Sequence, residues 1–108
     1  MLALLASEAN GACMADQPSL ADISSDKRNT VEGPQSVAKL EKANLSQNRD
    51  TGKFVPFGYG NKEWNELKAT MHPGDRIFFV THRDGHFFAD FHILVRGGVI
   101  CSLMGAIS

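Results

Sequence analysis

The chain has 108 residues, which limits it to at most one ordinary domain. Its 11 basic and 12 acidic residues give a formal net charge of −1, and the charges are interspersed along the chain. This balance gives no electrostatic basis for binding nucleic acid or an anionic membrane surface. Two cysteines are too few for a disulfide framework in a chain of this length. Because Cys13 and Cys101 lie in segments of very different character, we do not expect them to pair.

Residues 1–15 have some features of an export signal. Residues 1–6 are apolar, and the small residues Gly11 and Ala12 precede Cys13, which loosely resembles the lipidation site of a bacterial lipoprotein. No basic region comes first, and a bilayer span needs roughly 20 apolar residues, so we expect no transmembrane segment here or later. Residues 1–15 are a candidate leader remnant with Cys13 as the candidate lipidation site. The alternative is a frayed terminus with an incidental cysteine.

Residues 16–52 are polar and nearly free of aromatic side chains. Such a segment buries too little apolar surface to offset the entropy lost on ordering, so we expect a flexible linker. Val37 and Leu40 recur at helical spacing and predict a short helix within residues 37–45, which would be marginal alone. The alternative is that a helix of this N-terminal half docks onto the folded part.

Three aromatic residues open the part of the chain that we expect to fold, residues 53–108. Phe54, Phe57 and Tyr59 are separated by prolines and glycines, which prevent regular structure. We expect the three rings to pack over one end of the core. The alternative is an aromatic cluster on the surface that stacks against a ligand.

A helix is expected at residues 62–71. Asn61 precedes it as an N-cap, because its side chain can accept a hydrogen bond from an amide of the first turn. Pro73 disfavours helical geometry in the residue before it and ends the helix. Apolar residues recur at spacings of three and four, which places them on one face. These residues are Trp64, Leu67 and Met71.

Three apolar strands follow, at residues 75–81, 89–96 and 99–106. Gly97 and Gly98 predict a tight hairpin between the last two strands, because both glycines tolerate positive φ. The predicted fold class is therefore α+β. One helix packs on an antiparallel three-stranded β-meander, behind a largely disordered N-terminal half.

The two-glycine turn predicts the register of the second and third strands, with Arg96 opposite Val99 and Ile93 opposite Ser102. The apolar side of the helix is then expected against the sheet face that carries Phe91, Ile93, Val95, Ile100 and Met104, with its main contacts at the first three. The opposite face would carry Asp90, His92, Leu94, Cys101 and Leu103.

The register between the first and second strands stays open. If paired residue numbers sum to an even value, His82 shares a face with His92; if the sum is odd, the two lie on opposite faces. The odd register also places Asp75 opposite Arg96 as a cross-strand ion pair.

The third strand leaves an exposed edge, because residues 99–108 contain no charged side chain to protect it. We expect either a docked N-terminal segment or a homodimer to cover this edge.

Histidine and aspartate residues around the first hairpin are candidates for metal binding, because imidazole and carboxylate groups suit zinc or a similar ion. Their spacing matches no specific metal motif, so we favour solvated turn histidines and expect no cofactor. The candidate ligands are His82, His86, Asp90 and His92.

A cysteine nucleophile is the other candidate chemistry. Residues 71–80 (MHPGDRIFFV) resemble the segment of NlpC/P60 cysteine peptidases in which a helix is followed by Pro-Gly-Asp and an apolar strand. In that family a later strand opens with the catalytic histidine, and His92 has the corresponding place. The family's cysteine begins an upstream helix, where residues 61–64 (NKEW) contain none. Cys101 and His92 are the remaining candidates, two positions apart along one predicted face, and a buried structural cysteine is the alternative.

A closer resemblance covers residues 59–100. The runs GNKEWNELK (60–68), MHPGD (71–75) and LVRGGVI (94–100) resemble a group of small proteobacterial proteins, many of them exported, that share a Gly-Asn…Trp…Leu-Lys…Pro-Gly-Asp pattern before an apolar hairpin. The resemblance implies the same helix-plus-meander fold. It implies no activity and carries over no catalytic residue.

These observations favour a non-enzymatic binding or structural domain of the bacterial envelope, located in the periplasm or tethered near Cys13. If residues 1–15 are not a signal, a cytoplasmic location is expected instead. The alternatives are a degenerate NlpC/P60-like hydrolase using His92 and a metal-binding module in the hairpin of residues 82–92. A ligand or protein partner is expected, but its chemistry cannot be read from the sequence.

Overall fold

The computed structural model describes residue 13 and residues 19–105 of the chain. Most of the leader predicted at residues 1–15 therefore lies outside the described residues. The elements, in chain order, are α2 (Leu20–Ser25), β1 (Asn29–Gln35), α3 (Val37–Ala43), β2 (Leu45–Gln47), β3 (Phe54–Pro56), the 3₁₀ turn η1 (Gly58–Gly60), α4 (Asn61–Ala69), β4 (Arg76–Asp84), β5 (Phe87–Arg96) and β6 (Val99–Gly105).

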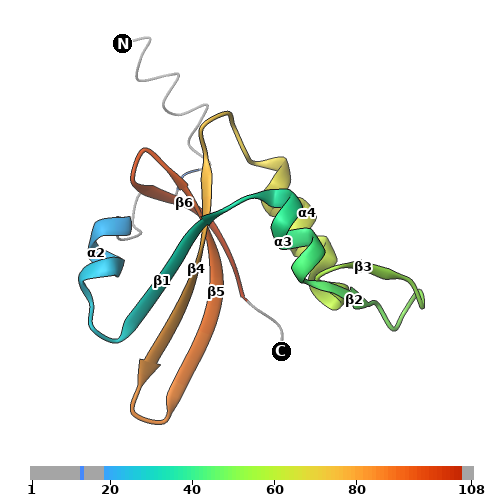
Figure 1. Cartoon of the computed structure of the whole chain (residues 1–108), viewed down its shortest axis with the longest axis horizontal. Helices are drawn as coiled ribbons and strands as arrows, with labels where there is room; N and C mark the ends of the chain where they lie inside the picture. The colour runs from blue at the N-terminus through green and yellow to red at the C-terminus, as the bar shows by residue number, and fades with distance from the viewer. Residues whose placement is uncertain (1–12, 14–18, 106–108) are drawn as a thin grey trace.

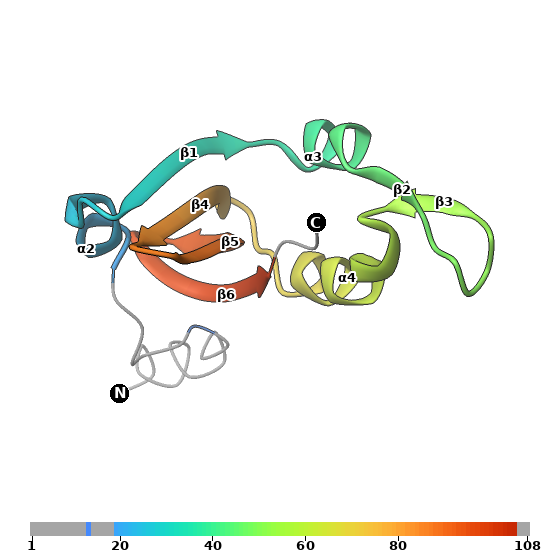
Figure 2. The same ribbon diagram turned by 90° about the horizontal axis from the view of Figure 1, so that it is seen from below.

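A four-stranded antiparallel sheet forms the centre of the α+β fold, with strand order β1-β4-β5-β6. In Figures 1 and 2, α2 lies towards one end of the molecule, and α3, α4 and the small β2–β3 hairpin lie towards the other. The three predicted strands are β4, β5 and β6, so the expected meander is present. The prediction of three strands is wrong, because β1 adds a fourth from the segment expected to be a linker.

The sequence analysis did not predict β1, because the composition of this segment is typical of a loop. Among its seven residues, only Val31 is a large apolar residue, and Gly33 and Pro34 stand near its end. An edge strand needs hydrogen-bond partners on one side only and tolerates proline. β1 pairs with β4 from Asn29 opposite His82 to Gln35 opposite Ile77, with a register shift after Glu32.

The hairpin of β5 and β6 forms as predicted at Gly97 and Gly98, with Arg96 opposite Val99. The predicted register also holds for Val95 opposite Ile100 and fails beyond that pair, because of a bulge between Val95 and Leu94. Val95 lies opposite Ile100, but Leu94 lies opposite Ser102, so Cys101 is an extra residue in β6. Every later residue of β6 is shifted by one, and Met104 and Leu103 exchange the faces expected for them.

β4 and β5 pair in the odd register, with Phe78 opposite Ile93 and His82 opposite Ala89. Because side chains alternate along a strand, His82 and His92 project from opposite faces of the sheet. This register resolves the alternative that the sequence left open.

Helix α4 buries the apolar face that its spacing predicted. Trp64 and Leu67 are fully or almost fully buried, and Met71 packs beside them although the helix ends at Ala69. Asn61 is the first helical residue rather than the N-cap, and its side-chain amide donates to the carbonyl of Pro56.

The face of the sheet that α4 covers is not the predicted one. Its buried partners in the sheet are Ile77, Leu94, Cys101 and Met104, instead of Phe91, Ile93 and Val95. Three consecutive apolar residues occupy β5, so both of its faces are apolar and the sequence pattern could not choose between them. The other face is covered at its edge by α2, where Ile23 packs in a cluster with Phe78, Val80, Ile93, Val95 and Ile100.

The helix predicted within residues 37–45 is α3, and it packs on α4 through Leu40. One carboxylate oxygen of Glu41 accepts hydrogen bonds from Trp64 Nε1 at 2.9 Å and from Lys68 Nζ at 2.6 Å. The bond from Lys68, followed by that from Trp64, lowers the pKa of Glu41. This contact explains how a helix of seven residues, too short to be stable alone, is held in place.

Cys13 and Cys101 form a disulfide, contrary to the expectation that they would not pair. The two cysteines lie far apart in sequence and in segments of different composition, which is why sequence reasoning missed the bond. The backbone of Leu20 also donates to the carbonyl of Gly98, and Ser19 forms an isolated bridge with Val99. The N-terminal segment therefore docks at the start of β6, which was one of the two alternatives for covering this edge.

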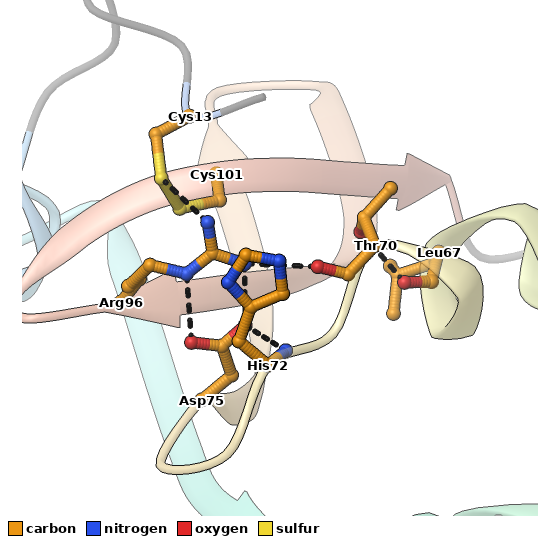
Figure 3. Close-up of a disulfide and its surroundings, with 7 residues drawn as sticks. All are labelled: Cys13, Leu67, Thr70, His72, Asp75, Arg96 and Cys101. Atoms are coloured by element: carbon orange, nitrogen blue, oxygen red, sulfur yellow. Dashed lines mark hydrogen bonds and ion pairs between the residues drawn. A yellow bond between two sulfur atoms is a disulfide. The ribbon is translucent and has the colours of Figure 1, made fainter. Parts of the chain in front are cut away.

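Arg96 lies at the junction of α4, the following turn, β5 and the disulfide (Figure 3). Its Nε and Nη2 bind the two carboxylate oxygens of Asp75 at 2.9 and 2.7 Å, as the odd register predicted. Nη2 also donates to the carbonyl of Thr70 at 2.9 Å, and Nη1 lies 3.5 Å from the sulfur of Cys13. The Asp75 side chain is only 1% exposed, so its charge depends on Arg96 for compensation.

No helix among the described residues has the length and apolar character needed to cross a bilayer.

We predict that Arg96→Met lowers the free energy of unfolding by about 3 kcal/mol, because it leaves the Asp75 carboxylate buried without its partner. Arg76→Met is the matched control, since Arg76 is an exposed arginine on β4 and forms no salt bridge within the described residues. Denaturant unfolding of both variants gives the comparison. A loss below about 1 kcal/mol for Arg96→Met would contradict the importance of this pair.

Candidate functional site

His92 is the most deeply buried of the candidate metal ligands. Its side chain projects from β5 between the rings of Phe57 and Phe79, whose centroids lie 5.2 and 4.9 Å from the imidazole. The residue is 4% exposed, and its Nδ1 has no hydrogen-bond partner among the described residues. Burial lowers the pKa of His92, and the charge of Asp90 raises it in part. The ring is thus held neutral in an aromatic environment.

The metal candidates are not brought together. His92 and Asp90 project from the face that carries α4, whereas His82 projects from the opposite face and hydrogen bonds to Asn29 at 2.6 Å through Nδ1. His86 is exposed in the turn between β4 and β5. Within residues 13 and 19–105, no group of three or more His, Cys, Asp or Glu side chains is arranged to hold a metal ion.

The cysteine–histidine pair is also separated. His92 lies opposite Met104, three residues beyond Cys101, which corresponds to about 10 Å along a strand. The sulfur of Cys101 is bonded to that of Cys13, so it is not a thiolate in this structure. The proposed nucleophile and base therefore do not form a hydrogen-bonded pair here.

The predicted lipidation of Cys13 concerns the same sulfur atom that forms the disulfide. A thioether-linked lipid and a disulfide cannot share one sulfur, so the two states exclude each other. Lipidation of Cys13 stays a prediction for a chain without the bond to Cys101.

A groove with a volume of about 600 Å³ lies between the end of α3, strand β2 and the turn η1. Phe57 lines the groove, and Phe57 and the next residue, Gly58, have left-handed backbone conformation, with φ of 65° and 50°. Phe57 is not a glycine, and this conformation costs on the order of 1–3 kcal/mol. A Cβ atom added to Gly58 would lie 3.1 Å from both side-chain atoms of Ser46, so glycine allows η1 to approach β2.

The side chains of the groove combine one cation with exposed aromatic and aliphatic surface. Arg49 is exposed and forms no ion pair or hydrogen bond through its guanidinium within the described residues. Tyr59 and Leu45 are 54% and 56% exposed and line the same groove. An open surface lined by a guanidinium and a tyrosine ring can bind a small molecule that carries both an anionic group and a flat apolar face.

The three aromatic residues before α4 are divided between the two alternatives considered from the sequence. Phe57 packs over the core against Trp64, with ring centroids 4.7 Å apart, as expected. Phe54 and Tyr59 are exposed, as the alternative of a surface cluster required. Sequence reasoning missed Arg49, because nothing in the surrounding run SQNRD (46–50) distinguishes it from a solvated loop arginine.

Comparison of the chain with protein-family models, with curated proteins and with solved structures found no match. The resemblances to NlpC/P60 peptidases and to exported proteobacterial proteins therefore stay predictions.

We predict that the protein loses stability as the pH falls below 6.5 because of His92. The unfolded chain binds a proton near pH 6.5, whereas the folded chain resists it, since the folded pKa is lowered. The stabilisation is therefore complete above pH 6.5 and is lost as the pH falls, by at most about 1.4 kcal/mol per pH unit. Urea unfolding at several pH values measures this slope.

His92→Phe is the informative variant, because a phenyl ring fits between Phe57 and Phe79 and cannot be protonated. This variant should remove the dependence of the free energy of unfolding on pH in this range, whereas His86→Asn in the exposed turn should leave that dependence unchanged. The stabilisation from the hydrogen-bonded carboxylates of Asp75 and Glu41, whose folded pKa values are lowered, is lost at lower pH, as the pH falls through and below about 4.5. An unchanged slope in His92→Phe would exclude His92 as the cause.

We also predict that Gly58→Ala destabilises the protein by about 2 kcal/mol more than Gly52→Ala does. Both glycines have positive φ, so alanine suffers the same kind of backbone penalty at each position. Only at position 58 does the added methyl group meet a neighbour, the side chain of Ser46. Equal losses of unfolding free energy would show that the close approach of η1 to β2 is unimportant.

Proposed function

We propose that this chain is a small exported domain of the bacterial cell envelope with a non-enzymatic, ligand-binding role. The bond between Cys13 and Cys101 is the observation that carries the proposal. Structural disulfides persist in oxidising compartments such as the periplasm and are rare in the reducing cytosol. The apolar residues at the start of the sequence and the resemblance to exported proteins support the same location.

The bond also defines how a leader would be processed. Removal of a leader after Cys13 would eliminate one of the two bonded cysteines, whereas cleavage at or before Ala12 keeps it. The small residues Gly11 and Ala12 suit such a cleavage site. The folded domain would then begin close to the residue that ties it to β6.

A binding role is favoured over catalysis by the arrangement of the reactive groups. Cys101 is bonded to Cys13, and His92 lies several residues away along the sheet. The groove beside η1, in contrast, presents an arginine and exposed apolar side chains to solvent. A degenerate NlpC/P60-like hydrolase would require a reduced Cys101 and a rearranged β6.

The test is the thiol state of the chain produced in a bacterium with its own N-terminus. We predict that the protein is recovered from the periplasm and reacts with a maleimide only after reduction, and then at two thiols. One reactive thiol without reduction, together with membrane partitioning, would indicate lipidation of Cys13 instead. Two reactive thiols and a cytoplasmic location would contradict the proposal.

Reduction should also destabilise the purified protein. The bond spans 88 residues of sequence, for which the loss of chain entropy predicts at most about 4.6 kcal/mol, and we expect a measured effect of about 2–4 kcal/mol. The double variant Cys13→Ser, Cys101→Ser should unfold at the same denaturant concentration whether or not a reductant is present. If a reductant also destabilises that variant, the reductant does not act through the disulfide.

A further inference from the structure

We propose that the groove between β2 and η1 binds a small organic anion with a flat ring, whose carboxylate or phosphate pairs with Arg49 and whose ring packs on Tyr59. The inference rests on the proposed binding role and names the class of ligand. Its residues come from a part of the fold that the disulfide does not touch, which allows the two proposals to be tested separately.

Backbone hydrogen bonds fix the elements that form the groove. The amide of Phe57 donates to the carbonyl of Asn44 at 2.7 Å, and the amide of Gly60 donates to the carbonyl of Phe57 at 2.7 Å. These bonds hold η1 against the end of α3 in spite of the left-handed backbone at Phe57 and Gly58. Backbone strain that is held in this way is concentrated at functional sites. The groove walls are therefore set before any ligand arrives.

Its charge favours an anion. Arg49 is the sole charged residue among the eight that line the groove, and the part of the chain that the structure describes offers its guanidinium no carboxylate partner. At the end of α3, the carbonyl of Leu40 accepts hydrogen bonds from Asn44, and the carbonyl of Asn44 accepts one from Phe57. A guanidinium binds a carboxylate or a phosphate through two parallel hydrogen bonds.

Its surface favours a ring. Two of the large hydrophobic side chains that remain exposed on the molecule, Tyr59 and Leu45, line this one groove, with Phe57 behind them. An aromatic ring or the apolar face of a sugar packs on such a surface and leaves the tyrosine hydroxyl in water. The hydroxyl of Ser46 offers a further hydrogen bond within the groove.

Trp64 can report ligand binding in the groove by NMR, because it lies next to Phe57. The ring of Phe57 contacts both the groove and Trp64, the one tryptophan of the chain. The indole N–H of Trp64 gives a single resolved signal in a nitrogen–proton correlation spectrum. A ligand that displaces Phe57 by a fraction of an ångström should move this signal together with the amide signals of Ser46 and Tyr59.

The experiment titrates the oxidised, isotope-labelled full chain with four probes, namely phenylacetate, its neutral analogue phenylacetamide, phenyl phosphate and inorganic phosphate. We expect saturable shifts at the groove amides and at Trp64 with phenylacetate or phenyl phosphate, and binding of phenylacetamide weaker by about tenfold. The stronger of the two ring-bearing anions identifies carboxylate or phosphate as the natural group. Inorganic phosphate should bind weakly, because it has no ring.

Two arginine variants make the test specific. Arg49→Gln should weaken phenylacetate to the level of phenylacetamide, whereas Arg83→Gln should change neither titration, although Arg83 is also an exposed arginine beside an aromatic ring, that of Phe88. Tyr59→Ala should weaken the binding of all three ring-bearing probes. The spectra of the variants themselves report whether the fold is intact.

Three results would overturn the proposal. They are the absence of saturable groove shifts with both ring-bearing anions, equal affinities for phenylacetamide and for the stronger of the two anions, and an equal loss of that anion's binding in the two arginine variants. None of these would affect the thiol state of the protein in cells, so failure of the anion site and failure of the envelope role are distinguishable.

Discussion

The ion pair between Arg96 and Asp75 is the contact on which the arrangement of the fold depends. Arg96 ends β5, Asp75 precedes β4, and the same guanidinium binds the carbonyl of Thr70 where α4 ends. One side chain therefore fixes the helix, the turn after it and two strands relative to one another. Hydrogen bonds from Arg96 hold the pKa of the Asp75 carboxyl below its usual range, so the pair stays ionised at neutral pH.

This contact also explains why α4 lies on one particular face of the sheet. β5 is apolar on both sides, and the faces compete equally for a covering helix as far as hydrophobicity is concerned. Arg96 and Leu94 project from the same face, because they are two positions apart on β5. A helix whose C-cap carbonyl, that of Thr70, binds Arg96 packs beside Leu94, and Trp64 and Leu67 are then buried with Ile77 and Met104.

The sequence was sufficient for elements with strong periodicity and turn signals, and it failed where tertiary contacts decide the structure. The spacing of Trp64 and Leu67 predicted α4, and the two glycines at 97 and 98 predicted the last hairpin. β1 is polar and exists because β4 offers it backbone partners, so no local pattern could reveal it.

The same distinction applies to the bulge at Cys101 and to the disulfide. The bulge inserts one residue in β6 and reverses the facing of all that follow, which alternation alone cannot anticipate. The bond to Cys13 joins segments that have no sequence feature in common.

For the candidate site, the sequence named candidate residues but not their relative positions, which depend on strand register and on the disulfide. His92 was singled out as a base or a ligand, and in the structure its ring is buried against Phe57 and Phe79. The aromatic residues before α4 were considered as a surface for a ligand, and that role stays a prediction. Tyr59 lines a groove whose one charged residue, Arg49, comes from a loop without any periodic signal. A groove built from β2, η1 and the end of α3 exists only once the chain has folded.

The bond between Cys13 and Cys101 has a mechanical consequence. It closes the intervening chain into a covalent ring that contains β1, β4, β5 and the three described helices. Tension applied to the two ends of the polypeptide would pass from one sulfur to the other and would bypass the sheet, so that only the last residues of β6 could be peeled away. In its oxidised form, the domain could therefore serve as a nearly inextensible unit between whatever is attached to its ends.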